Sequence, residues 1–225
     1  MVMALLRKIY SEVYRKLYHI YPYNPKKYWR DELGGPEKWS HNALHSESSK
    51  ETRRRAEEVV VPLLKSLDGV GIILDAGCGA GFFSYAFANS GLYDFVFGID
   101  FQKHRIDFAR KHFNHPKIGF LEGDLKLLPF PDNFFDTIWI SVVLLHLPIK
   151  DKILAIEELK RVLSPNGFCL FSESILPGNG VRFQQTAAHC IWVTLDWWKT
   201  YFSPLNIQVL RDVKDYEGLL FVTNK

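Results

Sequence analysis

This sequence has few of the features that by themselves assign a chain to a class of proteins. Cysteines number only three, and they lack the spacing of a zinc site or of a disulfide framework. No apolar run reaches the about 18 residues that cross a bilayer, and the N-terminal residues carry tyrosines and charges where a secretory signal needs an apolar stretch. A net charge of +3 is too small to indicate nucleic acid. We therefore expect a cytoplasmic protein without a metal site or a nucleic-acid partner.

The remaining composition fits one domain of generous size. Hydrophobic residues make up 47% of the 225 residues, which is enough for a full core. Residues 49–225 form the expected domain, with Ser48 or Ser49 as N-cap of its first helix, and residues 1–48 form an N-terminal extension. We expect strands at 71–74, 94–99, 117–121, 137–143, 168–171, 207–213 and 218–223, and helices at 49–67, 82–88, 103–113, 151–163 and about 183–201.

The most informative stretch, residues 73–81, reads Ile-Leu-Asp-Ala-Gly-Cys-Gly-Ala-Gly. An apolar strand ends at Asp75, three glycines follow at alternate positions, and residues 82–88 resemble a helix. Glycines let the backbone turn sharply near a ligand, and a helix start presents free N–H groups to an anion. Phe82 stands where a dinucleotide-binding fold has its third glycine, and the phosphate-binding P-loop pattern is absent. The stretch therefore predicts a nucleotide-cofactor site of another kind.

Two acids follow the next two expected strands. Asp100 lies about 20 residues past the glycines, where doubly wound folds place the carboxylate that binds ribose hydroxyls. The alternative role for Asp100 is a helix N-cap, because a helical stretch begins just after it. Asp124 is expected to accept a hydrogen bond from an adenine amino group, with Leu125 against the ring. The alternative for Asp124 is an ordinary loop carboxylate.

Taken in order, these features resemble the class I S-adenosylmethionine-dependent methyltransferases. The glycine stretch resembles the first motif of that family, and the acid after the second strand, Gly123-Asp124, the strand at 137–143 and the turn at 161–167 follow in the family's order. The resemblance covers about residues 55–175. It implies an α/β, doubly wound, Rossmann-like sheet of seven mostly parallel strands with an antiparallel last strand. The cofactor implied is S-adenosyl-L-methionine, bound by Trp29, Arg30, Asp75, Gly77, Cys78, Gly79, Gly81, Asp100, Phe101, Asp124, Leu125 and Ser141.

The N-terminal extension permits two interpretations. Apolar residues recur every three to four positions over residues 4–20, which predicts an amphipathic helix, and its polar face is basic. Such a helix either contacts an anionic membrane surface or packs on the domain as a lid. We favour the lid, because members of the family commonly carry N-terminal lid helices.

Residues 28–30, Tyr-Trp-Arg, resemble the short aromatic segment that closes over the cofactor in related enzymes. In protein α-amine methyltransferases, an arginine just after the glycines binds the cofactor carboxylate. Here Phe82 occupies that position, which departs from the pattern. Arg30 is our candidate to replace that arginine.

Methyl transfer from a sulfonium needs orientation above all, so catalytic residues are hard to recognise. His146 follows the fourth strand at the edge where ligands bind, and it is our candidate general base; the alternative is a histidine that caps the next turn. Glu173, after the fifth strand, is a further pocket candidate. We expect a small-molecule acceptor. A protein or peptide amine is the first alternative, and a non-catalytic cofactor-binding partner subunit is the second. The sequence does not fix the oligomeric state.

Overall fold

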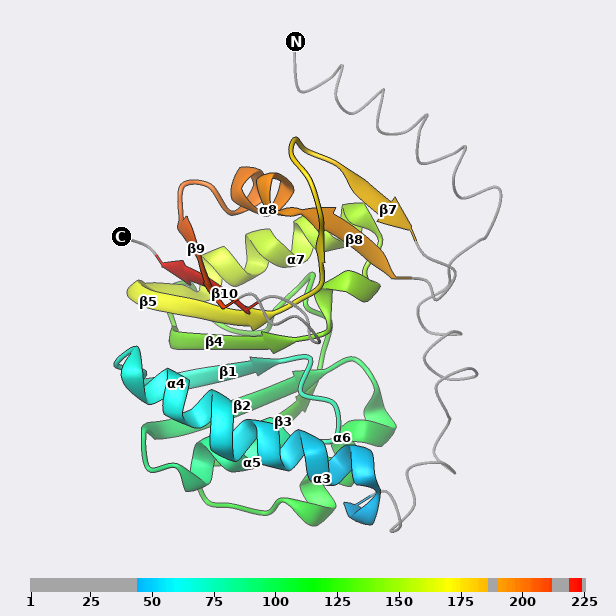
Figure 1. The fold of residues 1–225 in the computed structure, drawn as a ribbon. Coiled ribbons are helices and arrows are strands. Elements are labelled where there is room, and N and C mark those ends of the chain that lie inside the picture. Colours follow the sequence, from blue (N-terminus) through cyan, green and yellow to red (C-terminus); the bar gives the residue numbers. More distant parts are fainter. Residues whose placement is uncertain (1–43, 186–189, 212–218, 224–225) are drawn as a thin grey trace. The chain divides into compact units, whose positions relative to one another are not determined.

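The structure is a computed structural model that describes residues 44–185, 190–211 and 219–223. The predicted N-terminal helix and lid, with Trp29 and Arg30, lie outside these residues. The larger sheet has seven strands in the order β3-β2-β1-β4-β5-β10-β9 (Figure 1). Its strands are β1 (Gly71–Ala76), β2 (Tyr93–Asp100), β3 (Ile118–Glu122), β4 (Phe135–Ser141), β5 (Leu163–Ser172), β9 (Asn206–Arg211) and β10 (Leu219–Thr223).

The strand directions confirm the predicted α/β class with a parallel central sheet. Strands β1 to β5 pair in parallel, so the uninterrupted parallel part has five strands rather than seven. Strand β10, the last in sequence, runs antiparallel to both β5 and β9 and forms the terminal hairpin. The strand order reverses between β1 and β4. Open α/β sheets bind ligands at such a switch point, outside the carboxyl ends of the strands.

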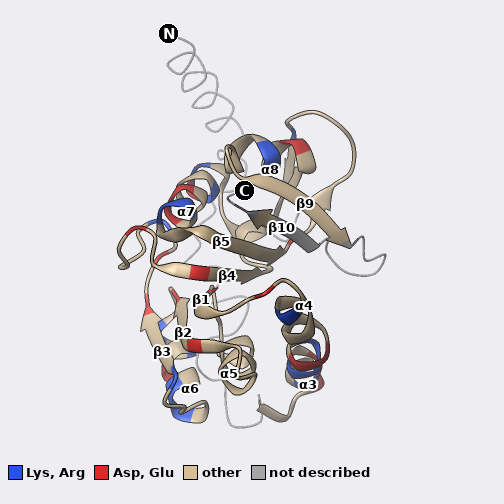
Figure 2. Ribbon diagram, turned by 90° about the vertical axis from the view of Figure 1, so that its left-hand side faces the viewer, with Lys and Arg blue, Asp and Glu red and all other residues tan. Residues whose placement is uncertain are grey.

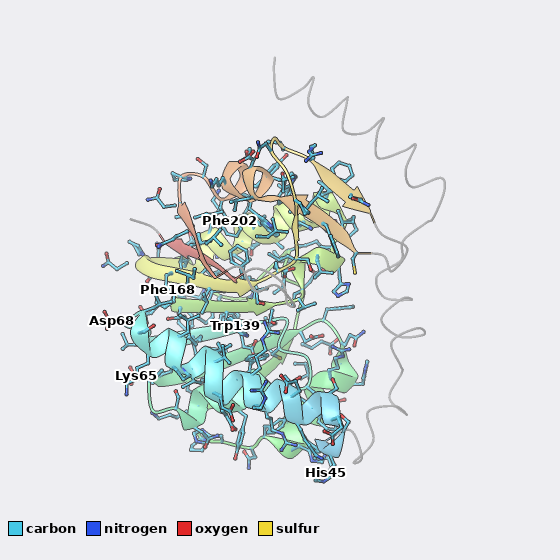
Figure 3. All side chains as sticks on the ribbon, in the orientation of Figure 1. His45, Lys65, Asp68, Trp139, Phe168 and Phe202 are labelled. Carbon is cyan, nitrogen blue, oxygen red and sulfur yellow. The ribbon has the colours of Figure 1, made fainter. Side chains whose placement is uncertain are left out.

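Helices pack on both faces of this sheet (Figure 2). On one face, Val60 and Leu64 meet Phe87, Trp139 and Phe168 in a buried cluster, in which Figure 3 labels Trp139 and Phe168. Helix α7 lies on the opposite face (Figure 2). The helices are α3 (Glu47–Arg55), α4 (Val61–Ser66), α5 (Phe82–Asn89), α6 (Lys103–His112), α7 (Ile149–Val162) and α8 (Leu195–Phe202), with a π-helical segment η4 (Ala56–Val60) and a 3-10 turn η5 (Leu144–His146).

The first helix of the domain differs from the prediction at its start. Ser46 is the N-cap, and its side chain accepts a hydrogen bond from the N–H of Ser49, so neither Ser48 nor Ser49 caps the helix. The helix widens into the π-helical segment η4 just before Pro62, where the Val61 N–H donates to Ala56 O. Proline has no N–H to continue the α-helical ladder, which explains why the wide turn lies here.

The predicted helix at about 183–201 is wrong over its first half. Strands β7 (Phe183–Gln185) and β8 (Ile191–Thr194) occupy that part, and with β6 (Ile175–Leu176) they form a second, three-stranded sheet. The run Ile-Trp-Val-Thr in β8 is rich in β-branched and aromatic residues, which favour a strand. Helix α8 begins only after Thr194, whose side chain accepts from the N–H of Trp197.

Candidate cofactor site

A cavity of about 460 Å³ opens at the carboxyl ends of β1 and β4, beside α3. Its walls come from α3, from the glycine loop after β1 and from the residues that follow β4. Of the predicted cofactor residues, the cavity is lined by Asp75, Gly77, Cys78, Gly79 and Ser141. Outside its lining lie Gly81, Asp100, Phe101, Asp124, Leu125 and His146.

The glycine loop needs its glycines for conformation and for space. Gly77, Gly79 and Gly81 have φ angles of 77°, 54° and 88°, which lie in the left-handed region that side chains disfavour. A β-carbon on Gly77 would lie 2.4 Å from Val143 Cγ2, and one on Gly81 would lie 2.8 Å from Phe120 Cζ. The loop therefore packs tightly against both the segment after β4 and strand β3.

Asp75 is the buried acid at the end of β1. Its carboxylate accepts a hydrogen bond of 2.6 Å from the hydroxyl of Ser84 on α5. Burial raises the pKa of Asp75 to about 7, and the Ser84 hydrogen bond opposes that shift. Asp75 thus joins β1 to α5 while it lines the cavity.

Asp100 connects the end of β2 to the glycine loop. One carboxylate oxygen accepts the N–H of Gly79 at 3.0 Å, and the other accepts the N–H of Gln102 at 2.9 Å. Gln102 is the N-cap of α6, so the helix-capping alternative for Asp100 is wrong. Burial raises the pKa of Asp100, and the positive charge of Arg105 is the largest opposing influence. Each carboxylate oxygen has a further lone pair that can accept a hydrogen bond.

The residues after β3 lie next to Asp100, because the N–H of Gly123 donates to Asp100 O at 3.0 Å. Asp124 accepts the N–H of Lys126 at 3.0 Å and pairs with its ammonium at 3.5 Å. Leu125 is buried, whereas Phe101, the residue after Asp100, is 36% exposed. Asp124 and Leu125, the residues predicted beside adenine, therefore follow β3 near Asp100, and Phe101 exposes its ring directly after Asp100.

His146 ends the 3-10 turn η5, and its Nδ1 lies 3.6 Å from the sulfur of Cys190. Burial lowers the pKa of His146 to about 4, with smaller contributions from the charges of Lys152 and Arg105. The ring is therefore neutral at pH 7. Glu173 also lies outside the cavity lining and is fully buried.

Arg55 is the residue that the sequence analysis missed. It lies on α3, and among the described residues that line the cavity it is the only arginine or lysine. Its Nη2 donates to the Ser172 hydroxyl at 2.5 Å. Arg53, Arg54 and Arg55 are consecutive, and a helix turns each one to a different side. Arg54 pairs with glutamates on the exposed side, so only the tertiary packing distinguishes Arg55.

The fold, the glycine loop and the acids at successive strand ends define a domain of the class I S-adenosylmethionine-dependent methyltransferase family. Residues 74–171 match the family model described as a methyltransferase domain. Over these residues the chain has a methyltransferase domain, and the match covers less than half of the chain.

Two curated relatives place this similarity in context. A malonyl-[acyl-carrier protein] O-methyltransferase of Erwinia pyrifoliae is 37% identical over 103 residues, which are 44% of this chain and 36% of that protein. A demethylmenaquinone methyltransferase of Staphylococcus haemolyticus is 33% identical over 108 residues, which are 46% of this chain and 44% of that protein. The chain thus matches less than half the length of these relatives.

Solved structures share the fold over a longer range. The PH0226 protein of Pyrococcus horikoshii has a TM-score of 0.64 at 19% identity, covering 81% of this chain and 94% of that chain. An S-adenosylmethionine-dependent methyltransferase of Aquifex aeolicus has a TM-score of 0.60 at 18% identity, covering 84% and 98%. Within the described part of our chain, no helix is long and apolar enough to cross a membrane, and no His, Cys, Asp and Glu cluster is arranged to hold a metal ion.

Proposed function

We propose that the chain binds S-adenosyl-L-methionine in the cavity beside α3 and transfers its methyl group to a small-molecule acceptor. The observation that carries this proposal is the link between the glycine loop and the acid of β2. Gly79 lines the cavity with a left-handed backbone, and its N–H is held by the Asp100 carboxylate. A cofactor at the loop therefore lies next to a carboxylate that still accepts hydroxyl donors.

The cavity lining and the neighbouring strand ends suit the chemical groups of this cofactor. Asp100 would accept the two ribose hydroxyls, as acids at this position do in doubly wound folds. Arg55 would bind the carboxylate of the methionine half, a role for which guanidinium geometry is well suited. Asp75, which lines the cavity at the end of β1, would attract the cofactor's ammonium group. Asp124, the ring of Phe101 and the side chain of Leu125 would then flank the adenine.

When bound, the cofactor supplies a methyl group on a positively charged sulfur. The residues of this chain contribute binding, orientation and the exclusion of water. His146 is the candidate general base from the sequence, and we propose that it touches the acceptor. Its lowered pKa makes it a weak base, so hydrogen bonding to the acceptor is favoured over removal of a proton.

The acceptor class is the finer part of the proposal. The two relatives carry different acceptors in their names, malonyl-acyl carrier protein and demethylmenaquinone. Both names support methyl transfer, and neither fixes the acceptor of this chain. We place a small molecule first because the demethylmenaquinone enzymes recur among the relatives.

Titration calorimetry with S-adenosylhomocysteine and with NAD tests the cofactor. We expect a dissociation constant in the low micromolar range for S-adenosylhomocysteine, about −7 to −8 kcal/mol, and no binding of NAD. Replacing Asp100→Ala should weaken binding by about 2–4 kcal/mol, because charge-assisted hydrogen bonds are lost. The reverse preference, for NAD, would refute the proposal.

Arg55 has a matched control in its neighbour. Arg55→Met should weaken S-adenosylhomocysteine by about 10-fold or more, because a charge-assisted contact is lost, whereas Arg54→Met should not. Binding of 5′-methylthioadenosine, which lacks the amino-carboxylate, should be the same in both variants. An equal loss for both ligands in Arg55→Met would show that the change disturbs the site rather than one contact.

Methyl transfer itself is tested with radiolabelled cofactor and two acceptor pools, one of small phenols and quinols and one of peptides with free amino termini. Label in the first pool supports the proposal. Label in the peptide pool alone would replace the small-molecule acceptor by an amine. No label in either pool, with the cofactor bound, would favour a non-catalytic partner subunit.

A further inference from the structure

Glu173, the residue directly after β5, is surrounded by backbone donors. Its side chain is fully buried, and its carboxylate accepts three consecutive N–H groups of the segment after β4. The distances are 2.8 Å from Val143, 2.7 Å from Leu144 and 3.1 Å from Leu145. These are N–H groups at the start of η5, which have no partner within their own turn. One side chain therefore accepts hydrogen bonds from all three backbone N–H groups at the start of this segment.

The same segment contains a strained residue. Val142 has a φ of 57°, which is an outlier for a β-branched side chain, and it lines the cavity. Its N–H donates to Ser172 O at 2.9 Å, so the end of β5 supports this residue too. Val143, the next residue, fills the space beside Gly77 in the glycine loop. A strained turn thus forms one wall of the cavity and packs against the glycine loop, which also lines it.

Glu173 has a countercharge in Lys152 of α7. The Lys152 side chain is fully buried, its ammonium donates to Ile191 O at 2.6 Å, and it lies over the rings of Trp197 and Trp198 at 5.7 and 5.4 Å. Burial raises the pKa of Glu173 and lowers that of Lys152, and their mutual attraction opposes both shifts. Three N–H donors and a nearby cation both stabilise the ionised carboxylate.

We propose that Glu173 is a positioning residue for the cofactor: its carboxylate holds the strained turn at Val142 against the glycine loop and so fixes the cavity wall from outside the cavity. The turn then reaches the cofactor through Val142 and the acceptor side through His146, which ends the same segment. Rigid support of this kind keeps a binding site in its productive geometry before the ligand arrives. This inference rests on the proposed function only where the cofactor is the probe.

The first test compares Glu173→Gln with Glu158→Gln. Glu158 is a matched control, because its carboxylate accepts the N–H of Leu128 at 2.7 Å but lies outside the cavity lining. A glutamine at 173 has one acceptor oxygen and places its own N–H groups against the backbone donors. We expect amide hydrogen exchange at residues 143–145 to become about 10-fold faster or more in Glu173→Gln, and affinity for S-adenosylhomocysteine to fall about 10-fold. Glu158→Gln should change neither value.

The second test asks whether Glu173 acts on the strain at Val142. Glycine accepts this φ without cost, so Val142→Gly should let the turn keep its shape without help from Glu173. In that background, Glu173→Gln should weaken S-adenosylhomocysteine by less than about 3-fold, against about 10-fold in the wild-type background. Equal losses in the two backgrounds would overturn the proposal.

Each remaining outcome also supports or overturns the proposed role of Glu173. If Glu173→Gln alone does not fold, a folded double variant with Val142→Gly supports the proposal, and an unfolded double variant overturns it, because the carboxylate would then serve the core alone. If Glu173→Gln folds and binds S-adenosylhomocysteine as the wild type does, the inference fails while the proposed function stands. If the wild type does not bind S-adenosylhomocysteine, the proposed function fails, and exchange at residues 143–145 still tests what Glu173 holds.

Discussion

Buried acids lie at the ends of β1 and β2 in one half of the sheet edge and directly after β5 in the other half, and their surroundings differ. Asp75 and Asp100 each use their carboxylates for one or two short-range hydrogen bonds beside the cavity or its loop. Glu173 accepts three N–H groups and faces the buried cation of Lys152. The first half keeps acceptor capacity for a ligand, whereas the second uses its capacity internally. Under the proposed function, one side of this edge binds the cofactor and the other side holds the shape of the site.

The largest effect is expected from removing the countercharge in the second half. Lys152→Ala leaves the Glu173 carboxylate buried without its cation and opens a gap between two tryptophans. Removing this fully buried side chain together with its hydrogen bond to Ile191 O costs about 3–5 kcal/mol. Urea unfolding followed by far-UV circular dichroism measures the loss.

Lys103→Ala is the control for Lys152→Ala. Lys103 pairs with Asp107 one helical turn away, and both side chains are at least half exposed. Such pairs contribute about 0.3–0.5 kcal/mol, so the control should unfold close to the wild type. A similar small loss in Lys152→Ala would show that the two halves do not differ in the way described.

The next largest effect is expected where the two halves touch. Gly77→Ala places a β-carbon 2.4 Å from Val143 Cγ2 and in a left-handed backbone with φ of 77°. Overpacking and backbone strain together should cost about 3 kcal/mol of unfolding free energy. Gly91→Ala isolates the strain, because its φ is 73° and nothing lies within 4 Å of the added carbon. If Gly77→Ala and Gly91→Ala lose equal stability in urea, the contact of Gly77 with Val143 adds no packing cost to the backbone strain.

How much the sequence revealed also differs between the halves. The glycine stretch, Asp75 and Asp100 lie within one strand-turn-helix-strand unit, so their grouping at one edge was predictable. Arg55 was not, because it is one of three consecutive arginines and only packing selects the one that lines the cavity. Its identification needed the position of α3 over the glycine loop.

In the second half, local pattern was misleading. The apolar positions of the helix at 151–163 include Leu154, yet Leu154 is 44% exposed while Lys152 is fully buried. The reason is that β8 and α8, from far along the chain, pack over Lys152 and supply Ile191 O and two tryptophan rings. Periodicity reports which face a helix buries against its sheet, and it carries no information on partners that arrive from distant segments.

The two halves should also differ in their response to pH. The pKa of His146 is lowered from 6.5 to about 4, so its contribution to stability is complete above pH 6.5 and is lost as pH falls toward 4. The pKa of Asp75 is raised from 3.8 to about 7, so its contribution is complete below about pH 4 and is lost as pH rises toward 7. The two residues therefore give opposite slopes over this range.

Difference measurements separate these slopes. The unfolding free energy of the wild type minus that of His146→Gln should fall by about 2 kcal/mol between pH 7 and pH 4, after discounting for the partial exposure of the ring. Wild type minus Asp75→Asn should change in the opposite direction. Parallel slopes for the two differences would contradict the assignment of both groups.

The smallest effect concerns the helix that carries Arg55. The Ser46 hydroxyl accepts the N–H of Ser49 at 3.2 Å and so caps α3. Ser46→Ala should cost about 1 kcal/mol, the usual loss for an N-cap, and the helix start should fray. Ser48→Ala, at a position the sequence suggested as the cap, should cost less than about 0.5 kcal/mol because it is an exposed site.

Because Arg55 lies at the far end of α3, affinity for S-adenosylhomocysteine should change by less than about 3-fold in Ser46→Ala. Urea unfolding and calorimetry on both variants decide. A larger loss of affinity would mean that the half with the glycine loop depends on distant contacts as much as the half with Glu173.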